Sequence, residues 1–529
     1  MPPSPLAGVI LLAVLAIAYA YRQARGKSQL PPGPSALPFL GNWRELRGRA
    51  AYLVLTQWSR LHGEFYSYRV GSTPIVVVGG ADAFDDVFYK KGALYNSRPL
   101  TSAQSHRVTG DSRGVMLPYG EPWRDRRRIL QTLLSGPGAK VFQPYQEYES
   151  RVTLLNLLER PELFHREMLR YSSSVTFGML LGARHESAEG FVPTRIREEM
   201  TLFWQHISPG CWLTDWFPIL EVLPDQLAPW RKKADRMRHR WVGFWSLFLD
   251  RMADRHAKGT AQDCFLTRFL DQPDVNRFNH EDKVGIVAEI LSAGTETTIS
   301  SLQWFFRAAL FSPEAFALAR EEIDRVVGPD RLPGWEDRSN LPYVEALVQE
   351  IHRWASVSPL GVAHATTADD VYRGSSVPRG TTVIANLYGA HHDPVTYPDP
   401  DRFLPARFLP ADHPLHAHGM AAVQKHFAFG VGRRACPGLQ VANSSLYIVI
   451  SRILWAFDIA QAPSGLPELK TLPSPLVLNL APFECRVTPR GDRVRDLIGV
   501  GMGALTPPAE LESASVYERL VAEWDKTAV

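Results

Sequence analysis

Residues 429–438 place a single cysteine in a glycine-rich loop, directly before an apolar stretch that predicts a long helix. The segment reads FGVGRRACPG. Gly430 and Gly432 permit a tight turn with free backbone N–H groups. The positive N-terminus of the following helix is expected to lower the pKa of the Cys436 thiol and favour the thiolate. Arg434 adds a cation that can bind a carboxylate. A lone thiolate in this setting can serve as a nucleophile or as a metal ligand.

Two simpler interpretations compete for this loop. The pattern G-x-G-x-x-A also occurs in dinucleotide-binding loops, but no clear strand precedes it and no acid of a matching βαβ unit follows. A buried structural cysteine is common in proteins, but the full pattern F-G-x-G-x-R-x-C-x-G argues against it. The chain's cysteines, Cys211, Cys264, Cys436 and Cys485, lie too far apart for a C-x-x-C zinc site or a disulfide framework.

The loop resembles the heme-binding loop of the cytochrome P450 family, in which a cysteine thiolate is the axial ligand of the heme iron. The resemblance implies heme b as the cofactor and Cys436 as the ligand of its iron. It also implies that Phe429, Arg434 and Gly438 belong to the heme-binding loop. The family's other motifs occur in the family order between about residues 31 and 490.

The motif AGTETT begins at Ala293, midway along a predicted helix at 279–311. A small residue followed by glycine leaves room beside a flat ligand, and Gly and Thr can loosen the helical hydrogen bonds and admit water. An acid beside a hydroxyl can carry protons into an apolar site. A close-packing patch between helices is the alternative. The resemblance implies that Thr297 and Glu296 are catalytic and that Ala293 and Gly294 adjoin the heme.

An Arg–Glu–Arg cluster is expected beneath the loop. Glu350 and Arg353 match the family's E-x-x-R, and residues three apart share a helix face on which they can pair. Surface pairs at this spacing are common, so the motif alone is weak. Residues 403–408 match F-x-P-x-R-F and supply Arg407. The resemblance implies a structural role for the three residues, because buried ionic clusters specify structure more than they add stability.

Donors for the heme propionates are the third expectation. Trp123 and Arg127 match the family's W-x-x-x-R, and indole N–H and guanidinium groups are both hydrogen-bond donors. His364 stands where the family often has a propionate-binding His or Arg. A structural histidine is the alternative for His364. Two carboxylates against a low-dielectric interior require such donors.

Helices dominate the elements that must position these residues. We predict helices at 279–311, 342–354 and 439–455, a β-hairpin at 65–79 and a strand at 381–385. No Pro- or Gly-rich break divides the body of the chain into two cores. The predicted fold class is therefore mainly α with small β-sheets, and the resemblance implies the cytochrome P450 fold.

The composition excludes several classes of protein. The 529 residues carry a net charge of +3, with 45% hydrophobic and 21% charged residues, which is ordinary globular composition. This excludes a disordered, collagen-like or polytopic membrane protein. The small net charge gives no reason to expect nucleic acid as a partner.

The N-terminus predicts a single membrane anchor. Residues 6–21 are apolar, and with the residues before them they give about 21 uncharged positions. At ~1.5 Å per residue this approaches the ~30 Å core of a bilayer. Arg22, Arg25 and Lys27 follow at once, so the positive-inside rule places the rest of the chain in the cytosol. A cleaved signal peptide is the alternative, but its positive charge should precede the apolar run.

The predicted organisation has four parts. These are a membrane anchor with its basic flank at 1–29, a proline-rich hinge at 30–40, a heme-thiolate catalytic domain at 41–499 and a C-terminal extension of unknown role at 500–529. We expect a single-pass protein of the endoplasmic reticulum membrane with a cytosolic catalytic domain.

The resemblance implies a monooxygenase that inserts one atom of O2 into an apolar small molecule. The chain shows no convincing Rossmann fingerprint, so electrons should come from NADPH through a separate reductase, with cytochrome b5 as a second candidate donor. The motif sequences are most similar to those of fungal secondary-metabolism members of the family, which suggests a terpenoid or polyketide substrate. The alternatives are a heme-thiolate isomerase or dehydratase without O2 activation and a non-catalytic, heme-free binding protein. The pairing of Thr297 with Glu296 argues against the isomerase.

Two surfaces carry weaker expectations. Arg126, Arg128, Lys425 and Arg433 flank the heme-binding motifs and are candidates for a cationic docking face, with solvated surface charge as the alternative. Residues 202–230 are rich in aromatic side chains, which suits a membrane-dipping lip or an ordinary core.

Overall fold

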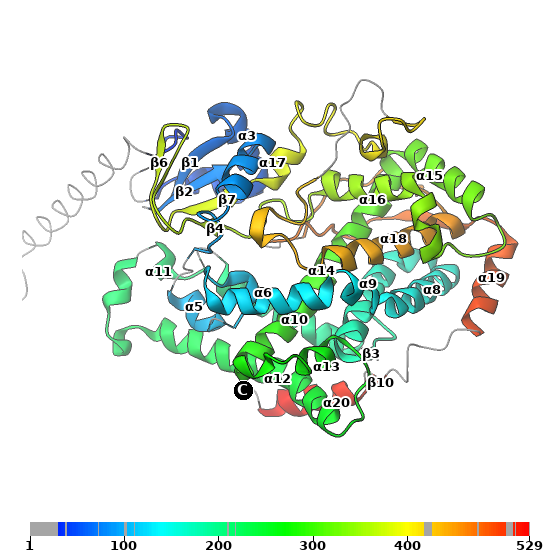
Figure 1. Cartoon of the computed structure of the whole chain (residues 1–529), viewed down its shortest axis with the longest axis horizontal. Coiled ribbons are helices and arrows are strands. Elements are labelled where there is room, and N and C mark those ends of the chain that lie inside the picture. Colours follow the sequence, from blue (N-terminus) through cyan, green and yellow to red (C-terminus); the bar gives the residue numbers. More distant parts are fainter. Residues whose placement is uncertain are drawn as a thin grey trace, which may run out of the picture.

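The predicted central helix is present as α14 (His280–Phe311), which is 32 residues long. Asn279 caps its start, because the Asn279 side chain accepts a hydrogen bond from the Asp282 N–H at 2.8 Å and Asp282 accepts one from the Asn279 N–H at 3.1 Å. Ser312 and Pro313 end the helix. Most of its residues are buried, and it runs through the helical body of the molecule (Figure 1).

This computed structural model describes residues 30–527 except 38–39, 72, 100–102, 111, 209–210, 217, 417–425, 473–475, 504–511 and 514. The predicted anchor at residues 1–29 therefore lies outside the described residues. Within the described ranges, none of the helices combines the length and the apolar composition that a membrane span requires.

The described elements are mostly helices with a few short strands, as predicted. The α-helices besides α14 are α2 (Trp43–Leu46), α3 (Ala51–His62), α4 (Ala81–Phe84), α5 (Ala103–Thr109), α6 (Glu121–Leu134), α7 (Pro137–Lys140), α8 (Gln143–Glu159), α9 (Phe164–Leu181), α10 (Phe191–Ile207), α11 (Leu213–Trp216), α12 (Pro229–Ala257), α13 (Phe265–Leu270), α15 (Pro313–Val326), α16 (Pro342–Ala355), α17 (Leu387–His391), α18 (Leu439–Ala456), α19 (Asp492–Gly503) and α20 (Ser515–Thr527). The π-helical turn is η1 (Asp85–Lys90), and the 3-10 turns are η2 (Gly114–Met116), η3 (Pro161–Leu163), η4 (Pro218–Val222), η5 (Asp225–Leu227), η6 (Val275–Arg277), η7 (Trp335–Asn340), η8 (Pro405–Phe408) and η9 (Gly432–Arg434).

The largest sheet lies at one end of the molecule (Figure 1). The predicted hairpin is confirmed as β1 (Phe65–Val70) and β2 (Thr73–Val78), which pair antiparallel. β7 (Thr382–Ala385) adds to β2 in parallel, and β4 (His364–Ala365) completes the sheet in the order β1-β2-β7-β4. The sheet thereby brings His364, at its edge, toward the helical body.

The remaining strands form two-stranded sheets. β5 (Asp370–Tyr372) pairs with β6 (Ser375–Val377), β8 (Phe457–Gln461) pairs with β9 (Cys485–Pro489), and β3 (Ala183–Arg184) pairs with β10 (Glu512–Ser513). The β3–β10 pair is parallel and joins the C-terminal residues to the middle of the chain.

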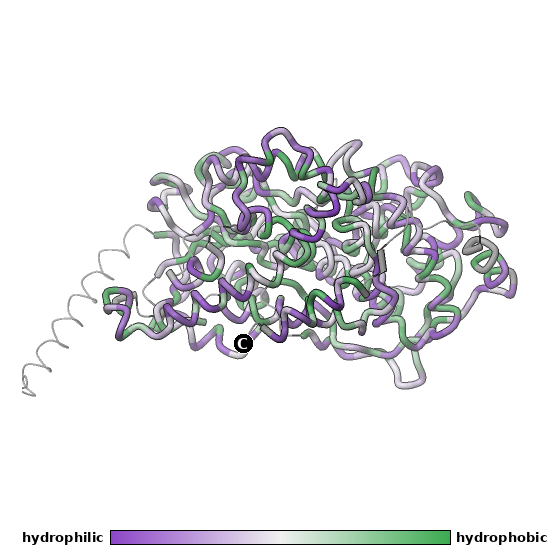
Figure 2. Tube along the Cα trace, turned by 90° about the horizontal axis from the view of Figure 1, so that it is seen from below, coloured by the Kyte–Doolittle hydropathy of each residue, from purple (hydrophilic) through white to green (hydrophobic). Residues whose placement is uncertain are grey.

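Helix packing forms the core around α14. Hydrophilic and hydrophobic residues alternate along the chain (Figure 2), which is the pattern of amphipathic helices. α9 lies so close to α14 that a Cβ at Gly294 would lie 3.0 Å from the Thr176 methyl group. The glycine therefore permits the close approach of the two helices.

The C-terminal extension has a defined place. α19 continues across the boundary that we predicted at residue 500, and α20 returns to the body beside α12 and α10 (Figure 1). Two aromatic residues of α20, Tyr517 and Trp524, contact aromatic side chains of α12. The extension is thus part of the packed structure where it is described.

Several histidines are buried as neutral rings. Burial lowers the pKa of His185 to about 3 and that of His352 to about 4. Burial also holds the pKa of His391 and of His426 well below the ordinary value. Protonation of these rings therefore opposes folding.

Acidification should lower the stability of the fold. These histidines titrate near pH 6.5 in an unfolded chain, so below that pH, down to the lower pKa of the folded state, the unfolded chain binds more protons. Each histidine then removes about 1.4 kcal/mol of unfolding free energy per pH unit. The unfolding temperature, measured by calorimetry between about pH 7 and about pH 5, should fall, and His185→Phe should make that fall shallower. The exposed His239→Gln is the control; an unchanged slope in His185→Phe would contradict the prediction.

Candidate functional site

The loop that carries Cys436 is held by backbone contacts that require its glycines. The Cys436 N–H donates to the Phe429 carbonyl at 2.7 Å. Gly430 and Gly432 have φ values of 80° and 59°, which lie in the left-handed region. A Cβ at Gly432 would also lie 2.2 Å from the Phe88 carbonyl oxygen. The two glycines thus let the loop turn tightly against the chain ahead of it and fix the position of the thiol.

The thiol of Cys436 is enclosed by protein and still accessible. Burial raises its pKa, and this outweighs the opposing effects of a hydrogen bond from Gly438 and the charge of Arg127. The expectation that the helix N-terminus lowers the pKa of this cysteine is therefore wrong for the free thiol. The free-energy cost of desolvating the thiolate exceeds the stabilisation that Gly438 and Arg127 provide. The Cys436 side chain is nevertheless exposed. A side chain with both properties faces an internal space.

The central helix faces an internal space as well. Ala293 is exposed although it lies in the middle of α14, and its neighbours Leu291 and Ser292 are buried. The side of Gly294 that a side chain would occupy faces α9 instead, so the close-packing interpretation applies to that residue. Glu289, one turn before Ala293, interacts electrostatically with the Cys436 thiol. These observations place the space between α14 and the cysteine loop.

Three guanidinium groups meet beside this space. Arg434 donates to the carbonyls of Asn96 at 2.6 Å and Leu117 at 2.9 Å. Arg127 donates to the carbonyl of Ala435. Within the described residues, Nη1 of Arg434 and Nε of Arg127 are buried without a hydrogen-bond partner. Both groups therefore retain donors that the protein does not use.

Arg98 is the third of these cations. Its Nη1 donates to the carbonyls of Val362 at 2.7 Å and Ala363 at 2.9 Å. Burial, followed by repulsion from Arg98 and Arg127, lowers the pKa of Arg434 to about 9, and burial lowers that of Arg98 to about 9. The carboxylate of Glu289 opposes these shifts but does not cancel them.

The cluster of cations fits an anionic ligand. Unused buried donors and crowded guanidinium groups are costly unless an anion compensates them. A group with two carboxylates, such as heme, would supply that compensation next to an accessible thiol. The residues present therefore fit heme. Sequence reasoning missed Arg98, because a lone arginine in a loop has no spacing partner to mark it.

Trp123 and His364 lie in the same region. The Arg434 guanidinium carbon is 4.1 Å from the centre of the Trp123 ring. His364 is 5% exposed, and its Nδ1 is hydrogen-bonded to the Tyr95 carbonyl at 2.8 Å. Burial and then the charges of Arg98 and Arg434 hold the pKa of His364 well below its ordinary value. An anion bound here would favour the protonated ring.

The acid and hydroxyl of the AGTETT motif are partly accessible. The Thr297 hydroxyl donates to the Ala293 carbonyl at 2.7 Å, one turn back along α14. Burial raises the pKa of Glu296, and the charge of Arg113 opposes the rise. A carboxyl group with a raised pKa holds its proton closer to neutral pH, which suits a general acid.

The Arg–Glu–Arg residues lie together in the core. Glu350 pairs with Arg353 at 2.7 Å and with Arg407 at 3.4 Å, and the side chains of all three residues are 0% exposed. Arg353 also donates to the His391 carbonyl at 2.9 Å, and the His391 ring accepts from the Phe427 N–H at 2.8 Å. The cluster is thus linked to the start of the cysteine loop. Sequence reasoning missed His391.

The proposed docking face is not supported at Arg126. That side chain is 4% exposed and pairs with Asp282 at the start of α14, so it joins α6 to α14 and is not available to a partner. Arg128 and Arg433 are exposed. Lys425 lies outside the described residues.

The described aromatic side chains at 202–230 lie in the hydrophobic core or pack against it. Phe203 and Trp212 are 3% and 7% exposed. Among the side chains of this segment that the structure describes, the large apolar ones that are exposed are Leu213, Val222 and Leu227. The aromatic lip is therefore wrong for Phe203 and Trp212, because these rings pack inward.

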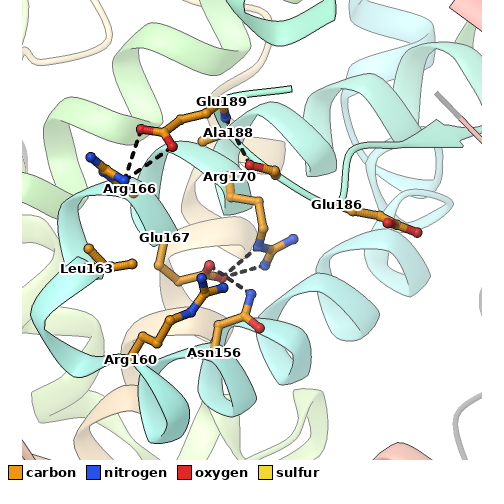
Figure 3. A pocket seen from close by; sticks show the side chains of 10 residues that line it. Asn156, Arg160, Leu163, Arg166, Glu167, Arg170, Glu186, Ala188 and Glu189 are labelled. Atoms are coloured by element: carbon orange, nitrogen blue, oxygen red, sulfur yellow. Dashed lines mark hydrogen bonds and ion pairs between the residues drawn. The ribbon is translucent and has the colours of Figure 1, made fainter. Parts of the chain in front are cut away.

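A separate polar pocket lies at the surface between α8, α9 and residues 186–189. Its volume is about 100 Å³, which is small beside the ~300 Å³ or more of a typical ligand site. Glu167 accepts hydrogen bonds from Asn156 and Arg170, and Arg166 pairs with Glu189 (Figure 3). These groups satisfy one another, so the pocket is not a candidate for the active site.

Comparison with known proteins agrees with this geometry. The family model described as Cytochrome P450 matches residues 31–485. The cytochrome P450 monooxygenase polD of Polytolypa hystricis is 38% identical over 498 residues, which cover 91% of this chain and 94% of the relative. The cytochrome P450 monooxygenase fogE of Aspergillus ruber is 33% identical, with 93% and 92% covered. Cytochrome P450 monooxygenase 253 of Postia placenta is 34% identical, with 90% and 91% covered.

The match extends over most of the chain, and the family binds heme through a cysteine thiolate. An accessible, enclosed thiol beside a cluster of cations is the arrangement that such a cofactor needs. The chain belongs to the cytochrome P450 family and is an oxidoreductase of its monooxygenase class.

Proposed function

We propose that this protein inserts one atom of O2 into an apolar small molecule, with Cys436 as the axial ligand of heme b. The observation that carries the proposal is the internal space between the accessible thiol of Cys436 and the exposed Ala293 of α14. Heme held there supplies O2 activation and one-electron chemistry, and a thiolate ligand favours O–O cleavage. The protein supplies binding, proton delivery and exclusion of water.

Five residues hold the propionates in this proposal. Arg98, Arg127 and Arg434 supply guanidinium donors, and Trp123 and His364 supply ring N–H groups. The unused donors of Arg127 and Arg434 support the assignment. Phe429 and Gly438 complete the loop beneath the heme, and Glu350, Arg353 and Arg407 hold that loop in place.

Glu296 and Thr297 deliver protons in this proposal. Glu296 holds a proton at higher pH than an exposed glutamate because it is largely desolvated. Rotation about χ1 lets the Thr297 hydroxyl leave the Ala293 carbonyl and donate into the space beside α14. Glu296 and Thr297 thus form a path for protons along α14 to the place beside the heme where the substrate reacts.

The substrate belongs to the apolar natural products of fungi, with terpenoids and polyketides as the first classes to examine. Val115, Leu360 and Val362 are partly exposed beside residues of the site, which supports an apolar ligand. A separate NADPH reductase, with cytochrome b5 as a second donor, supplies the electrons. Residues 1–29 anchor the protein to the endoplasmic reticulum membrane.

Loss of the thiol should abolish the spectrum of a thiolate-ligated heme. We expect Cys436→Ala to lose the shifted Soret band of the reduced carbon monoxide complex. Cys211→Ala should keep it, because that exposed cysteine lies far along the chain from the loop. Retention of the band in Cys436→Ala would overturn the ligand assignment.

Loss of a propionate donor should weaken heme binding. Arg434→Gln removes one buried cation, and we expect the heme content of the purified protein to fall by on the order of tenfold, since charge-assisted hydrogen bonds contribute about 1.5–3 kcal/mol each. The exposed neighbour Arg433→Gln is the matched control and should retain heme. Equal heme content in the two variants would contradict the assignment.

Loss of the hydroxyl should uncouple turnover. With a reductase, NADPH and a terpenoid or polyketide that the unaltered protein oxidises, Thr297→Ala should lower product formation by on the order of 100-fold. NADPH consumption should continue and release hydrogen peroxide. The adjacent Thr298→Ala, a buried residue on another face of α14, is the control. Full product yield in Thr297→Ala would count against the proton relay.

A further inference from the structure

The C-terminal residues return to the helical body and contact three helices, α9, α10 and α12. β10 pairs in parallel with β3, which directly follows α9. α20 then lies against α12 and α10 (Figure 1). These contacts join the last described part of the chain to elements more than 250 residues earlier in the sequence.

Tyr517 connects α9 with α12. It is 0% exposed and belongs to the same hydrophobic cluster as both helices. Its ring centre lies 5.2 Å from that of Phe177 in α9 and 5.5 Å from that of Phe248 in α12, and the Phe248 ring is stacked on it at 14°. The Tyr517 side chain therefore packs between α12 and α9, and α9 in turn packs closely on α14.

Trp524 and Asp525 connect α10 with α12. The Trp524 ring centre lies 5.7 Å from the guanidinium carbon of Arg195 in α10 and 5.2 Å from that of Arg240 in α12. Asp525 accepts from Arg195 at 2.7 Å. Both arginines also bind the buried Glu199. One turn of α20 thus closes a network of charges that spans both helices.

The fit between α20 and α12 depends on a glycine. A Cβ at Gly243 would lie 3.1 Å from Nε1 of Trp524, which is closer than side chains usually approach. Phe244, the next residue, has its ring centre 5.3 Å from that of Trp524. The indole is therefore seated on the surface of α12.

α10 and α12, the two helices that Trp524 and Asp525 connect, cover the site. The guanidinium carbon of Arg113 lies 4.8 Å from the ring centre of Phe203 in α10 and 5.6 Å from that of Trp241 in α12. Arg113 donates to the Ser292 hydroxyl at 3.0 Å, and Ser292 precedes Ala293. α10 and α12 thus form a roof over the accessible face of α14.

The segment that links α10 to α12 does not by itself fix the position of one helix relative to the other. Residues 208–228 contain only short turns where they are described, namely α11, η4 and η5. A long connection of this kind does not fix the angle between the helices that it joins. Lateral contacts must therefore hold α10 and α12 together.

We propose that β10 and α20 form a strap that holds the roof helices α10 and α12 closed over the site. The strap pairs with β3 and packs on Phe177 of α9, and both belong to the closely packed body. It contacts α10 and α12 through Trp524 and Asp525. Release of the strap would let the roof move away from α14 and admit bulky ligands faster. The inference goes beyond the proposed function, because the opening of the roof is a property of the fold with or without turnover.

Hydrogen exchange of the full-length holoprotein tests the strap. We expect Trp524→Ala to accelerate exchange about tenfold in residues 191–207 and 229–257, since losing its ring contacts removes part of the lateral support. Exchange in residues 342–355 of α16 should stay unchanged. Asp525→Asn is a milder second variant that keeps the apolar contacts. Glu523→Gln is the control, because Glu523 is an exposed neighbour.

Ligand entry gives a second measurement. The association rate of the bulky azole clotrimazole, followed by the Soret shift of the heme, should rise in Trp524→Ala and stay unchanged in Glu523→Gln. The proposal is overturned if α20 exchanges faster while α10 and α12 do not, or if exchange rises equally throughout the molecule. A failure of the heme assignment would instead appear as a missing Soret band, which leaves the exchange result intact.

Discussion

Buried positive charge without an equal number of carboxylates is the constraint on which the site depends. Arg98, Arg127 and Arg434 converge beside the thiol of Cys436, and Glu289 offsets only part of their charge. A cation in a low-dielectric interior is costly unless an anion compensates it. The charge of Arg127 opposes the rise that burial causes in the pKa of Cys436, and the three cations together suit the carboxylates of heme. The protein alone therefore carries an electrostatic deficit that its cofactor is suited to remove.

The scaffold keeps that region rigid from the side opposite α14. Glu350 satisfies Arg353 and Arg407, and the two arginines bind the carbonyls of the segment at 391–402. His391 links this network to the start of the loop, because its ring accepts a hydrogen bond from the Phe427 N–H. Because the side chains of Glu350, Arg353, Arg407 and His391 are buried and hydrogen-bonded, the network favours one arrangement of the loop.

The other face of the site is built differently. α14 packs closely on α9 through Gly294, whereas α10 reaches it across Arg113 and α12 lies against its first turns, where Arg238 pairs with Glu281. One side of the central helix is thus fixed by close contact and the other is covered by helices whose mutual position depends on side-chain contacts. The C-terminal residues supply many of those contacts. A rigid cofactor site beneath an adjustable roof suits an enzyme that must hold heme permanently and exchange its ligands.

The residues that carry the chemistry were evident in the sequence because their signals are local. The loop at 429–438, the cap at Asn279 and the hairpin at 65–79 each depend on spacing within a few residues, so pattern and composition were sufficient. The positions of Arg98, Arg113, His391 and α20 were not predictable in this way. Each of them acts through contacts with residues far away in the sequence, and no local pattern records which distant partner a side chain meets. The burial of Arg126 and the packing of Gly294 on α9 were decided in the same manner, by helices that meet only when the whole chain is folded.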